Sequence, residues 1–451
     1  MQITRLKEIY KKKTRRSRNL YTHSTKIFPG GVSHNIRFFE PYPFFTSRAK
    51  GKYLYDVDGN KYTDYWMGHW ALILGHSPPQ VVQALSNQIR YGVLYGTTND
   101  IALQLGEYIQ KLMPAAESMR FSNSGSEATM YAVRLARAKT KRRVIAKIIG
   151  GWHGYNTTLL ETVNYPFEVN EGTGLIPEEL QFIKSIPFND LQGSLELLRP
   201  IKDDLACIIV EPLLAGSGCI PPAEGYLRGL EEFCHNNESL FILDEIVTGF
   251  RLSIQGAAHK FKLNPDLFTL GKIVGGGLPI GVLCGKKEIM SLCDPTLRLQ
   301  KDERCAIGGG TYSANPITMT AGLSTLKYID YNRDAIYSKI DKLGEYTRNG
   351  LAKIFSDAKL NVQITGMGSL FLVHFLNSRV YRIVSPSDVA SSDREMLVKY
   401  HFELLTKHGI FFLPSKMGAF SYAHTQSDVK RLLEATTSIM ESGTLKKLHK
   451  K

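Results

Sequence analysis

The sequence predicts an α/β protein built on a largely parallel β-sheet, and three observations carry this prediction. Between residues 96 and 345, stretches with apolar residues at helical spacing alternate with short apolar runs. Two of these runs, residues 206–210 (ACIIV) and 240–243 (LFIL), contain no charged residue, as expected of strands buried on both faces. Residues 127–139 (EATMYAVRLARAK) have helical periodicity and follow the small residues of SNSGS, which can cap a helix.

An acidic residue follows each of the two apolar runs. Glu211 comes directly after residues 206–210, and Asp244 comes directly after residues 240–243. The carboxyl ends of parallel strands face the crevice in which α/β proteins bind ligands. Since a buried carboxylate without a partner is costly, packing alone does not explain these residues. Both are therefore candidate site residues.

The length of 451 residues predicts a large domain with a smaller partner, because single cores stop growing at roughly 250–300 residues. We expect an N-terminal segment over 1–95, a large domain over 96–345 and a small α+β domain over 346–451. Within the first segment, residues 52–65 (KYLYDVDGNKYTDY) predict a hairpin about the turn Asp58-Gly59-Asn60.

The formal charge of +14 raises the possibility of a nucleic-acid or membrane-surface partner. Residues 1–20 carry a net charge of +7 and residues 446–451 carry +4, which leaves the rest of the chain nearly neutral. A solvated helical arm explains these ends more simply than a nucleic-acid site does.

Other composition features exclude several classes of protein. Six cysteines have no C-x-x-C pair and no metal-type spacing with histidine, so we expect reduced thiols and neither a metal site nor a disulfide framework. No apolar segment of signal-peptide or membrane-spanning length occurs, so we expect a cytoplasmic protein.

The motif SNSGSEAT offers a site for an anion. Its small residues, Ser124, Gly125 and Ser126, would bring backbone N–H groups and hydroxyls together at a helix N-terminus, which suits phosphate. A capped helix without a ligand is the alternative.

Lys272 is an isolated lysine among glycines and apolar residues in TLGKIVGGGLPIG. Desolvation there would lower its pKa and make it a nucleophile that can form a Schiff base. A surface lysine is the alternative. The order of GKIVGGG does not match the G-x-x-x-x-G-K-[ST] loop that binds nucleotide phosphates. Asp244 could hold a pyridinium nitrogen protonated by a close ion pair.

In GGWHG, Trp152 and His153 lie between glycines that allow close approach to a flat ligand. A buried core tryptophan is the alternative.

The order of these motifs resembles the class III aminotransferases, in the branch that includes glutamate-1-semialdehyde 2,1-aminomutase. The resemblance covers nearly the whole chain and runs through FPGGV, DY…LILGH, NSGSEAT, WHG, VEP, DEIVTGFR, LGKIVGGGLPIG, GTYSANP and LPS…AHT. It implies a type I pyridoxal-phosphate-dependent fold, with a seven-stranded sheet in the large domain and a small domain formed by both terminal segments. It also implies a homodimer with active sites at the subunit interface.

The resemblance assigns roles to single residues. Pyridoxal 5′-phosphate would form a Schiff base with Lys272 and pair its ring nitrogen with Asp244. Trp152 and Ile246 would contact the two faces of the ring, with His153 and Glu211 near the cofactor. Phosphate contacts would come from Ser124, Gly125 and Ser126, and from Thr311 of the neighbouring subunit.

Four positions on the substrate side depart from the aminomutase pattern. PGGVSHNIR keeps Arg37 as a carboxylate-binding residue but places His34 and Asn35 where serine and proline are usual. His69 aligns with a pocket tryptophan, PSKMGAF lacks a glutamate, and Gly216 replaces an asparagine. Because the cofactor motifs are intact, we expect an aminotransferase of unassigned amino-acid substrate in preference to an aminomutase. His34, Arg37 and His69 are the candidate substrate-binding residues.

Overall fold

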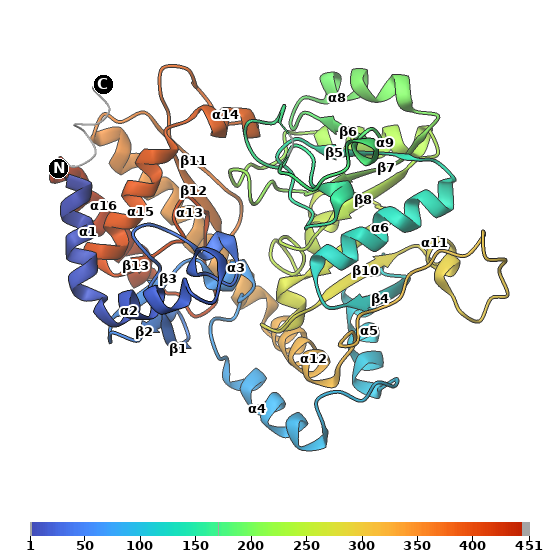
Figure 1. Ribbon diagram of the computed structural model, residues 1–451, viewed down its shortest axis with the longest axis horizontal. Coiled ribbons are helices and arrows are strands. Elements are labelled where there is room, and N and C mark those ends of the chain that lie inside the picture. The colour runs from blue at the N-terminus through green and yellow to red at the C-terminus, as the bar shows by residue number, and fades with distance from the viewer. Residues whose placement is uncertain (1, 170, 444–451) are drawn as a thin grey trace. The chain divides into compact units, whose positions relative to one another are not determined.

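The computed structural model describes residues 2–169 and 171–443 and divides the chain into two compact units (Figure 1). The large unit comprises residues 79–337 and 384–387, and the small unit comprises the residues before 79, residues 338–383 and those from 388 onward. The boundaries expected after residues 95 and 345 stay predictions. The compact units divide earlier, because α4 (Pro79–Gln88) packs against α12 (Pro316–Tyr331) in the large unit.

A seven-stranded sheet forms the centre of the large unit, in the order β4-β10-β9-β8-β7-β5-β6. Strands β9, β8, β7, β5 and β6 are parallel, whereas β10 runs antiparallel to both of its neighbours. The strands are β4 (Ser118–Ser122), β5 (Val144–Ile148), β6 (Ile183–Ile186), β7 (Leu205–Val210), β8 (Leu240–Asp244), β9 (Leu267–Gly271) and β10 (Gly281–Gly285). The predicted α/β fold class is confirmed, and the two predicted apolar runs lie within β7 and β8.

Helices accompany this sheet in the alternating order that the sequence predicts. The longer ones are α5 (Asp100–Leu112), α6 (Gly125–Thr140), α8 (Leu191–Leu198), α9 (Tyr226–Asn236) and α12. Short helical turns are η3 (Ile89–Tyr91), η4 (Thr157–Leu159), α7 (Pro177–Leu180), η5 (Arg199–Ile201), α10 (Gly256–Phe261), η6 (Lys272–Gly275), α11 (Lys287–Met290) and η7 (Ser291–Cys293). Helix α6 packs on β7, β8, β9 and β10, so its N-terminus is fixed by the centre of the sheet.

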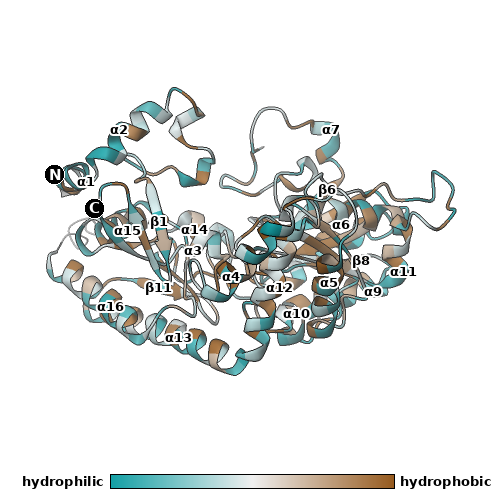
Figure 2. Cartoon of the chain, turned by 90° about the horizontal axis from the view of Figure 1, so that it is seen from below, coloured by the Kyte–Doolittle hydropathy of each residue, from teal (hydrophilic) through white to brown (hydrophobic). Residues whose placement is uncertain are grey.

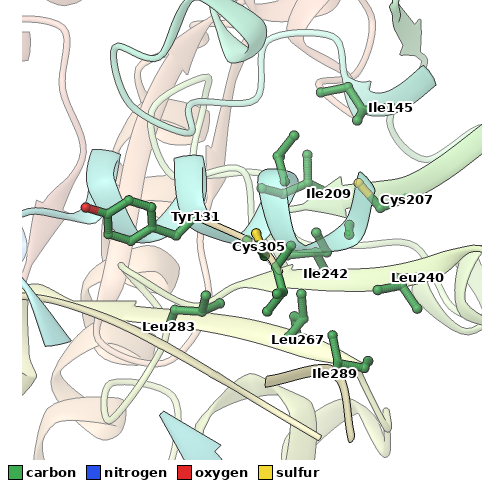
Figure 3. Close-up of a cluster of buried hydrophobic side chains, with 14 of the residues drawn as sticks. Tyr131, Ile145, Cys207, Ile209, Leu240, Ile242, Leu267, Leu283, Ile289 and Cys305 are labelled. Carbon is green, nitrogen blue, oxygen red and sulfur yellow. The ribbon is translucent and has the colours of Figure 1, made fainter. Parts of the chain in front are cut away.

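A hydrophobic cluster between α6 and the sheet holds the large unit together (Figure 3). Ile209, Ile242 and Leu283 contribute from three strands, and Tyr131 and Leu135 contribute from α6. Each large aliphatic side chain buried in this way stabilises the fold by roughly 1.5–3 kcal/mol. β8 is coloured as hydrophobic in Figure 2, as expected of a central strand covered on both faces.

The small unit is assembled from both ends of the chain. One sheet has the order β1-β2-β3-β13 and another the order β11-β12-β14. The elements, of which α13 and α14 begin in the large unit, are α1 (Gln2–Lys13), α2 (Arg15–Ser24), η1 (Pro29–Gly31), η2 (Asn35–Arg37), β1 (Thr46–Lys50), β2 (Tyr53–Asp56), β3 (Lys61–Asp64), α3 (Met67–Trp70), α13 (Arg333–Asp357), β11 (Val362–Thr365), β12 (Leu370–Phe375), α14 (Pro386–Ser391), α15 (Arg394–His408), β13 (Ile410–Phe411), β14 (Gly418–Ala419) and α16 (Gln426–Glu441). The predicted hairpin is confirmed as β2 and β3, and the parallel pairing of β13 with β3 joins the two ends of the chain.

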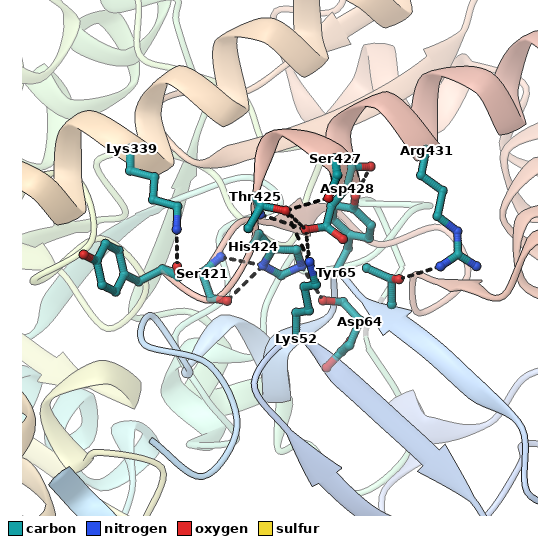
Figure 4. Close-up of polar contacts among 12 residues, drawn as sticks. Lys52, Asp64, Tyr65, Lys339, Ser421, His424, Thr425, Ser427, Asp428 and Arg431 are labelled. Atoms are coloured by element: carbon teal, nitrogen blue, oxygen red, sulfur yellow. Dashed lines mark hydrogen bonds and ion pairs between the residues drawn. The ribbon is translucent and has the colours of Figure 1, made fainter. Parts of the chain in front are cut away.

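A buried polar network in the small unit links the hairpin region to α16 (Figure 4). The Lys52 ammonium lies 2.5 Å from the Asp428 carboxylate, which also accepts hydrogen bonds from the backbone and hydroxyl of Thr425 and so caps α16. Burial opposes ionisation of Asp428, but the hydrogen bonds from Lys52 and Thr425 outweigh it and lower its pKa. Burial also lowers the pKa of His424 to about 4, so its ring is neutral near pH 7.

The basic N-terminal arm is helical, as predicted, but it is not wholly solvated. Leu6 and Tyr10 of α1 are 4% and 2% exposed, and α1 packs against α15. Lys13 donates a hydrogen bond of 2.8 Å to the backbone oxygen of Thr406. The basic tail at 446–451 lies outside the described residues. Among the residues that the structure describes, no helix is both long and apolar enough to cross a membrane.

Candidate active site

The N-terminus of α6 is shaped by the SNSGS residues. The Ser124 hydroxyl caps the helix by accepting a hydrogen bond from the backbone of Glu127 (3.3 Å). A Cβ atom at Gly125 would lie 2.5 Å from Cδ1 of Ile246, so a larger residue there would displace the Ile246 side chain. Ile246 therefore contacts the first turn of a 16-residue helix, whose N-terminal end favours an anion.

The GGWHG segment lies against the same turn. A Cβ atom at Gly154 would lie 2.3 Å from the Ser126 hydroxyl oxygen, and the Tyr155 backbone donates to that oxygen at 3.3 Å. Trp152 is 37% exposed, and its ring meets the Tyr155 ring edge to face with centroids 4.8 Å apart. Trp152 is thus not a core tryptophan, which was the alternative that the sequence left open.

Asp244 ends β8 with its carboxylate almost completely buried. One oxygen lies 2.7 Å from Nδ1 of His153, and the other accepts hydrogen bonds of 3.1 Å from the Thr269 hydroxyl and from the Ile246 backbone. His153 was a candidate from its motif, but no sequence signal pairs it with Asp244, because 91 residues separate the two.

The state of His153 follows from its surroundings. Burial lowers its pKa, although the hydrogen bond and the charge of Asp244 act in the opposite direction. The ring is therefore neutral near pH 7, and its proton sits on Nδ1 because a carboxylate can only accept. Nε2 of the ring is buried and has no hydrogen-bond partner among the described residues. It faces the interior as an unused acceptor.

Glu211, directly after β7, is 5% exposed and accepts hydrogen bonds from two backbone groups, Trp152 N (2.9 Å) and Ala215 N (3.3 Å). Burial raises its pKa to about 8, and the nearby charge of Asp244 adds to this effect. A carboxyl group in this state is largely protonated at neutral pH.

Lys272 follows β9 at the start of η6 and is partly buried. Its φ of +49° is a strained conformation for a residue with a side chain, and such strain is most often found at functional sites. Burial lowers its pKa overall, and the negative charge of Asp244 opposes this effect, as does that of Glu211 once Glu211 has lost its proton. The charges of all three groups therefore act on one another. A lysine with a lowered pKa is a better nucleophile.

The remaining residue predicted for the cofactor site is Thr311, which is exposed. Its neighbour Gly310 lies against the SNSGS motif, because a Cβ atom at Gly310 would be 2.1 Å from Nδ2 of Asn123. The expected reach of Thr311 into a second subunit stays a prediction.

The three candidate substrate-binding residues lie together in the small unit. The rings of His34 and His69 are 5.7 Å apart between centroids, and exposed Arg37 donates a hydrogen bond of 2.8 Å to the Ser33 hydroxyl. His69 belongs to a run of four residues with positive φ, Met67 to Trp70. This left-handed turn is unfavourable for residues with side chains, and no sequence signal predicts it. The substrate-binding roles stay predictions.

Together, the strand-end carboxylates, the lysine of lowered pKa and the helix N-terminus define an enzyme of the pyridoxal-phosphate-dependent α/β type. The chain belongs to the class III aminotransferases, because the family model "Aminotransferase class-III" matches residues 38–421. The curated glutamate-1-semialdehyde 2,1-aminomutase of Methanobrevibacter smithii is 38% identical over 434 residues, which cover 96% of this chain and 99% of that protein.

Solved structures agree with the fold. An ω-transaminase from Sphaerobacter thermophilus superposes with a TM-score of 0.87 at 29% identity, covering 94% of this chain and 97% of the other. A glutamate-1-semialdehyde aminomutase from Pseudomonas aeruginosa in complex with PMP has a TM-score of 0.85 at 21% identity, covering 96% of each chain. Pyridoxal phosphate is the cofactor of this family, as the sequence predicts.

The raised pKa of Glu211 makes a prediction about stability. In the unfolded chain this carboxyl loses its proton near pH 4.5, and in the folded chain it does so near pH 8. Its contribution to stability is therefore present at low pH and is lost as the pH rises from the unfolded value through about 8. Relative to the wild type, Glu211→Gln, which cannot ionise, should gain roughly 3 kcal/mol of stability as the pH rises from 6 to 9.

Urea unfolding of both proteins at pH 6 and pH 9 measures this change. The other titrating groups are the same in both proteins, so their contributions cancel when the two free energies of unfolding are subtracted. A difference in the free energy of unfolding that does not vary with pH would contradict the assignment.

Proposed function

We propose that this chain is an aminomutase of the glutamate-1-semialdehyde type, which moves an amino group between neighbouring carbons of one substrate. The observation that carries the proposal is the match over 96% of the chain, at 38% identity, to a curated enzyme of that name. The sequence favoured transfer between two molecules and kept the aminomutase as the alternative. The curated relatives support that alternative better than the first choice.

The described side chains of the large unit suit pyridoxal phosphate. The cradle formed by Gly125 and Gly154 lies at a helix N-terminus with two serine hydroxyls, Ser124 and Ser126, which suits a phosphate group. Asp244 offers a buried carboxylate for a pyridinium nitrogen, and Lys272 offers the amine for covalent attachment. Ile246 and Trp152 supply apolar surface for a flat ring.

The bound cofactor supplies an electron sink for the substrate carbon that carries the amino group. The protein residues do the rest. The negative charge of Asp244 would stabilise a protonated ring nitrogen. His153 holds the Asp244 carboxylate in one orientation through its hydrogen bond of 2.7 Å. The Lys272 amine would accept a proton from a substrate carbon and return it to a neighbouring atom.

Arg37, His34 and His69 are the proposed substrate contacts. An exposed guanidinium is suited to a substrate carboxylate. Burial, together with the positive charge of Arg37, lowers the pKa of His34, so its ring is neutral near pH 7 and can act as a hydrogen-bonding group.

A transaminase acting between two molecules is the second candidate. The changes at His34, His69 and Gly216 favour it, because they alter the substrate side while the cofactor side is intact. The similarity to the ω-transaminase from Sphaerobacter thermophilus, at 29% identity, also favours the transaminase.

The two candidates are separated by supplying glutamate-1-semialdehyde to the cofactor-loaded protein without an amino donor or acceptor. We expect 5-aminolevulinate to form, because the amino group returns to the same molecule. Lys272→Ala should reduce the rate by about 10²-fold or more. Lys287→Ala, which removes an exposed lysine in the same unit, should leave the rate unchanged.

Product that forms only when a separate amino donor and keto acceptor are present would overturn the aminomutase proposal in favour of the transaminase.

A homodimer is the assembly that we propose. Large apolar side chains are exposed over α4, η3 and α5, including Ile89 (61%), Tyr91 (78%) and Leu103 (64%). A groove beside them is lined by residues of α4, η3, α5 and α12, among them Tyr91 and Tyr331. Exposed apolar surface of this extent in a well-packed unit marks an interaction site, and a second copy is the partner that the family resemblance implies.

The dimer proposal predicts the effect of a charge placed in this surface. Tyr91→Glu should convert the dimer to monomers, whereas Tyr381→Glu, at a side chain 89% exposed in the small unit, should not. Light scattering coupled to size-exclusion chromatography measures the mass. A wild-type mass of one chain at micromolar concentration would contradict the proposal.

A further inference from the structure

Lys147 is a fully buried lysine that the proposed reaction does not use. It lies on β5 with 0% exposure, two residues after Ile145 and on the same face of the strand. Ile145 belongs to the hydrophobic cluster of the large unit, so an apolar residue is the natural choice at position 147. Lysine is almost never fully buried unless its charge has a function or a partner.

The ammonium group of Lys147 has two backbone acceptors. It donates to the carbonyl oxygen of Glu161 at 2.6 Å and to that of Ile148 at 3.2 Å. No carboxylate lies within ion-pair distance of it among the described residues, although the charges of Glu161 and Glu211 act on it from farther away. These hydrogen bonds connect the end of β5 to Glu161, which comes 14 residues after Lys147 in the chain.

The residues between these two points form a closed loop, here called the 150–161 loop. Its neck is held by the Gly150 backbone, which donates to the Thr162 oxygen at 2.7 Å, and by the Lys147 bond to Glu161. The Ser217 hydroxyl also donates to the Gly150 oxygen.

The 150–161 loop carries Trp152 and His153 to the candidate active site. Trp152 N reaches Glu211, and His153 Nδ1 reaches Asp244. The His153 oxygen accepts a hydrogen bond of 2.5 Å from the Thr129 hydroxyl of α6. The loop is thus fixed at its neck by Lys147, and at residues 152 and 153 by Glu211, Asp244 and Thr129.

We propose that Lys147 is a positioning residue, whose buried ammonium group closes the neck of the 150–161 loop and so holds Trp152 and His153 against Glu211 and Asp244. The inference deepens the proposed function, since it concerns the same site. The proposal predicts that Lys147 stabilises the 150–161 loop, and this effect can be measured without the cofactor. A methionine at this position would fill the same volume without donating a hydrogen bond.

Hydrogen exchange followed by mass spectrometry on the full chain tests the proposal. In Lys147→Met, the backbone amides of residues 150–161 should exchange about ten-fold faster than in the wild type. Ile145→Ala is the matched control. It removes core volume from the same face of β5, in the cluster that also contains Leu159 of the loop, so exchange of the 150–161 loop should rise less than in Lys147→Met.

A second readout separates positioning from a purely structural role. After loading with pyridoxal phosphate, Lys147→Met should show a weaker visible circular dichroism band than Ile145→Ala, because a loosened Trp152 holds the ring less rigidly. Lys147→Gln, whose side chain is too short to reach the Glu161 oxygen, should behave like Lys147→Met.

Exchange of the 150–161 loop that stays within about two-fold of the wild type in both Lys147 variants would overturn the proposal. Failure of both variants to give soluble protein would also overturn it, since Lys147 would then be needed for the fold itself. A wild-type protein that binds no cofactor would refute the proposed function but leave the exchange result valid.

Discussion

The contact between Asp244 and His153 is the interaction on which the rest of the candidate site depends. A carboxylate at the end of a central strand is unfavourable unless donors surround it, and here a histidine, a hydroxyl and a backbone amide do so. Each donor comes from a different part of the chain, namely the 150–161 loop, β9 and the residues after β8. One buried carboxylate therefore connects the 150–161 loop, β8 and β9.

The same anion sets the electrostatics of its neighbours. The charge of Asp244 partly offsets the burial that lowers the pKa of Lys272, and it adds to the burial that raises the pKa of Glu211. The Lys272 amine thus lies near the charged Asp244 and the largely neutral Glu211. A single negative charge can stabilise a protonated ring nitrogen, whereas two would also hold Lys272 in its protonated form. Burial and the nearby charge of Asp244 raise the pKa of Glu211, and its two backbone hydrogen bonds only partly offset this.

Much of this architecture is predictable from the sequence, because bare apolar runs define β7 and β8 and their ends place Glu211 and Asp244. The glycines of the motifs also indicate where the chain packs closely at the site, since a Cβ atom at Gly125 or Gly154 would lie 2.5 Å or less from a neighbouring side chain. The pairing of His153 with Asp244 was not predictable, since it links residues far apart in the chain. Neither was the role of Lys147, which looks like any other lysine until its burial is known. The left-handed turn at His69 depends on tertiary contacts that no local pattern encodes.

Among the described residues of the large unit, Lys147 and Lys272 are buried or partly buried lysines of lowered pKa, and we propose different roles for them. Lys147 is bound to backbone oxygens, whereas Lys272 follows β9 in a strained conformation beside Asp244 and Glu211. Borohydride reduction of the pyridoxal-phosphate-loaded protein, followed by digestion and mass spectrometry, distinguishes them. We expect a stable phosphopyridoxyl group on Lys272. A modified Lys147, or the absence of any modified lysine, would contradict it.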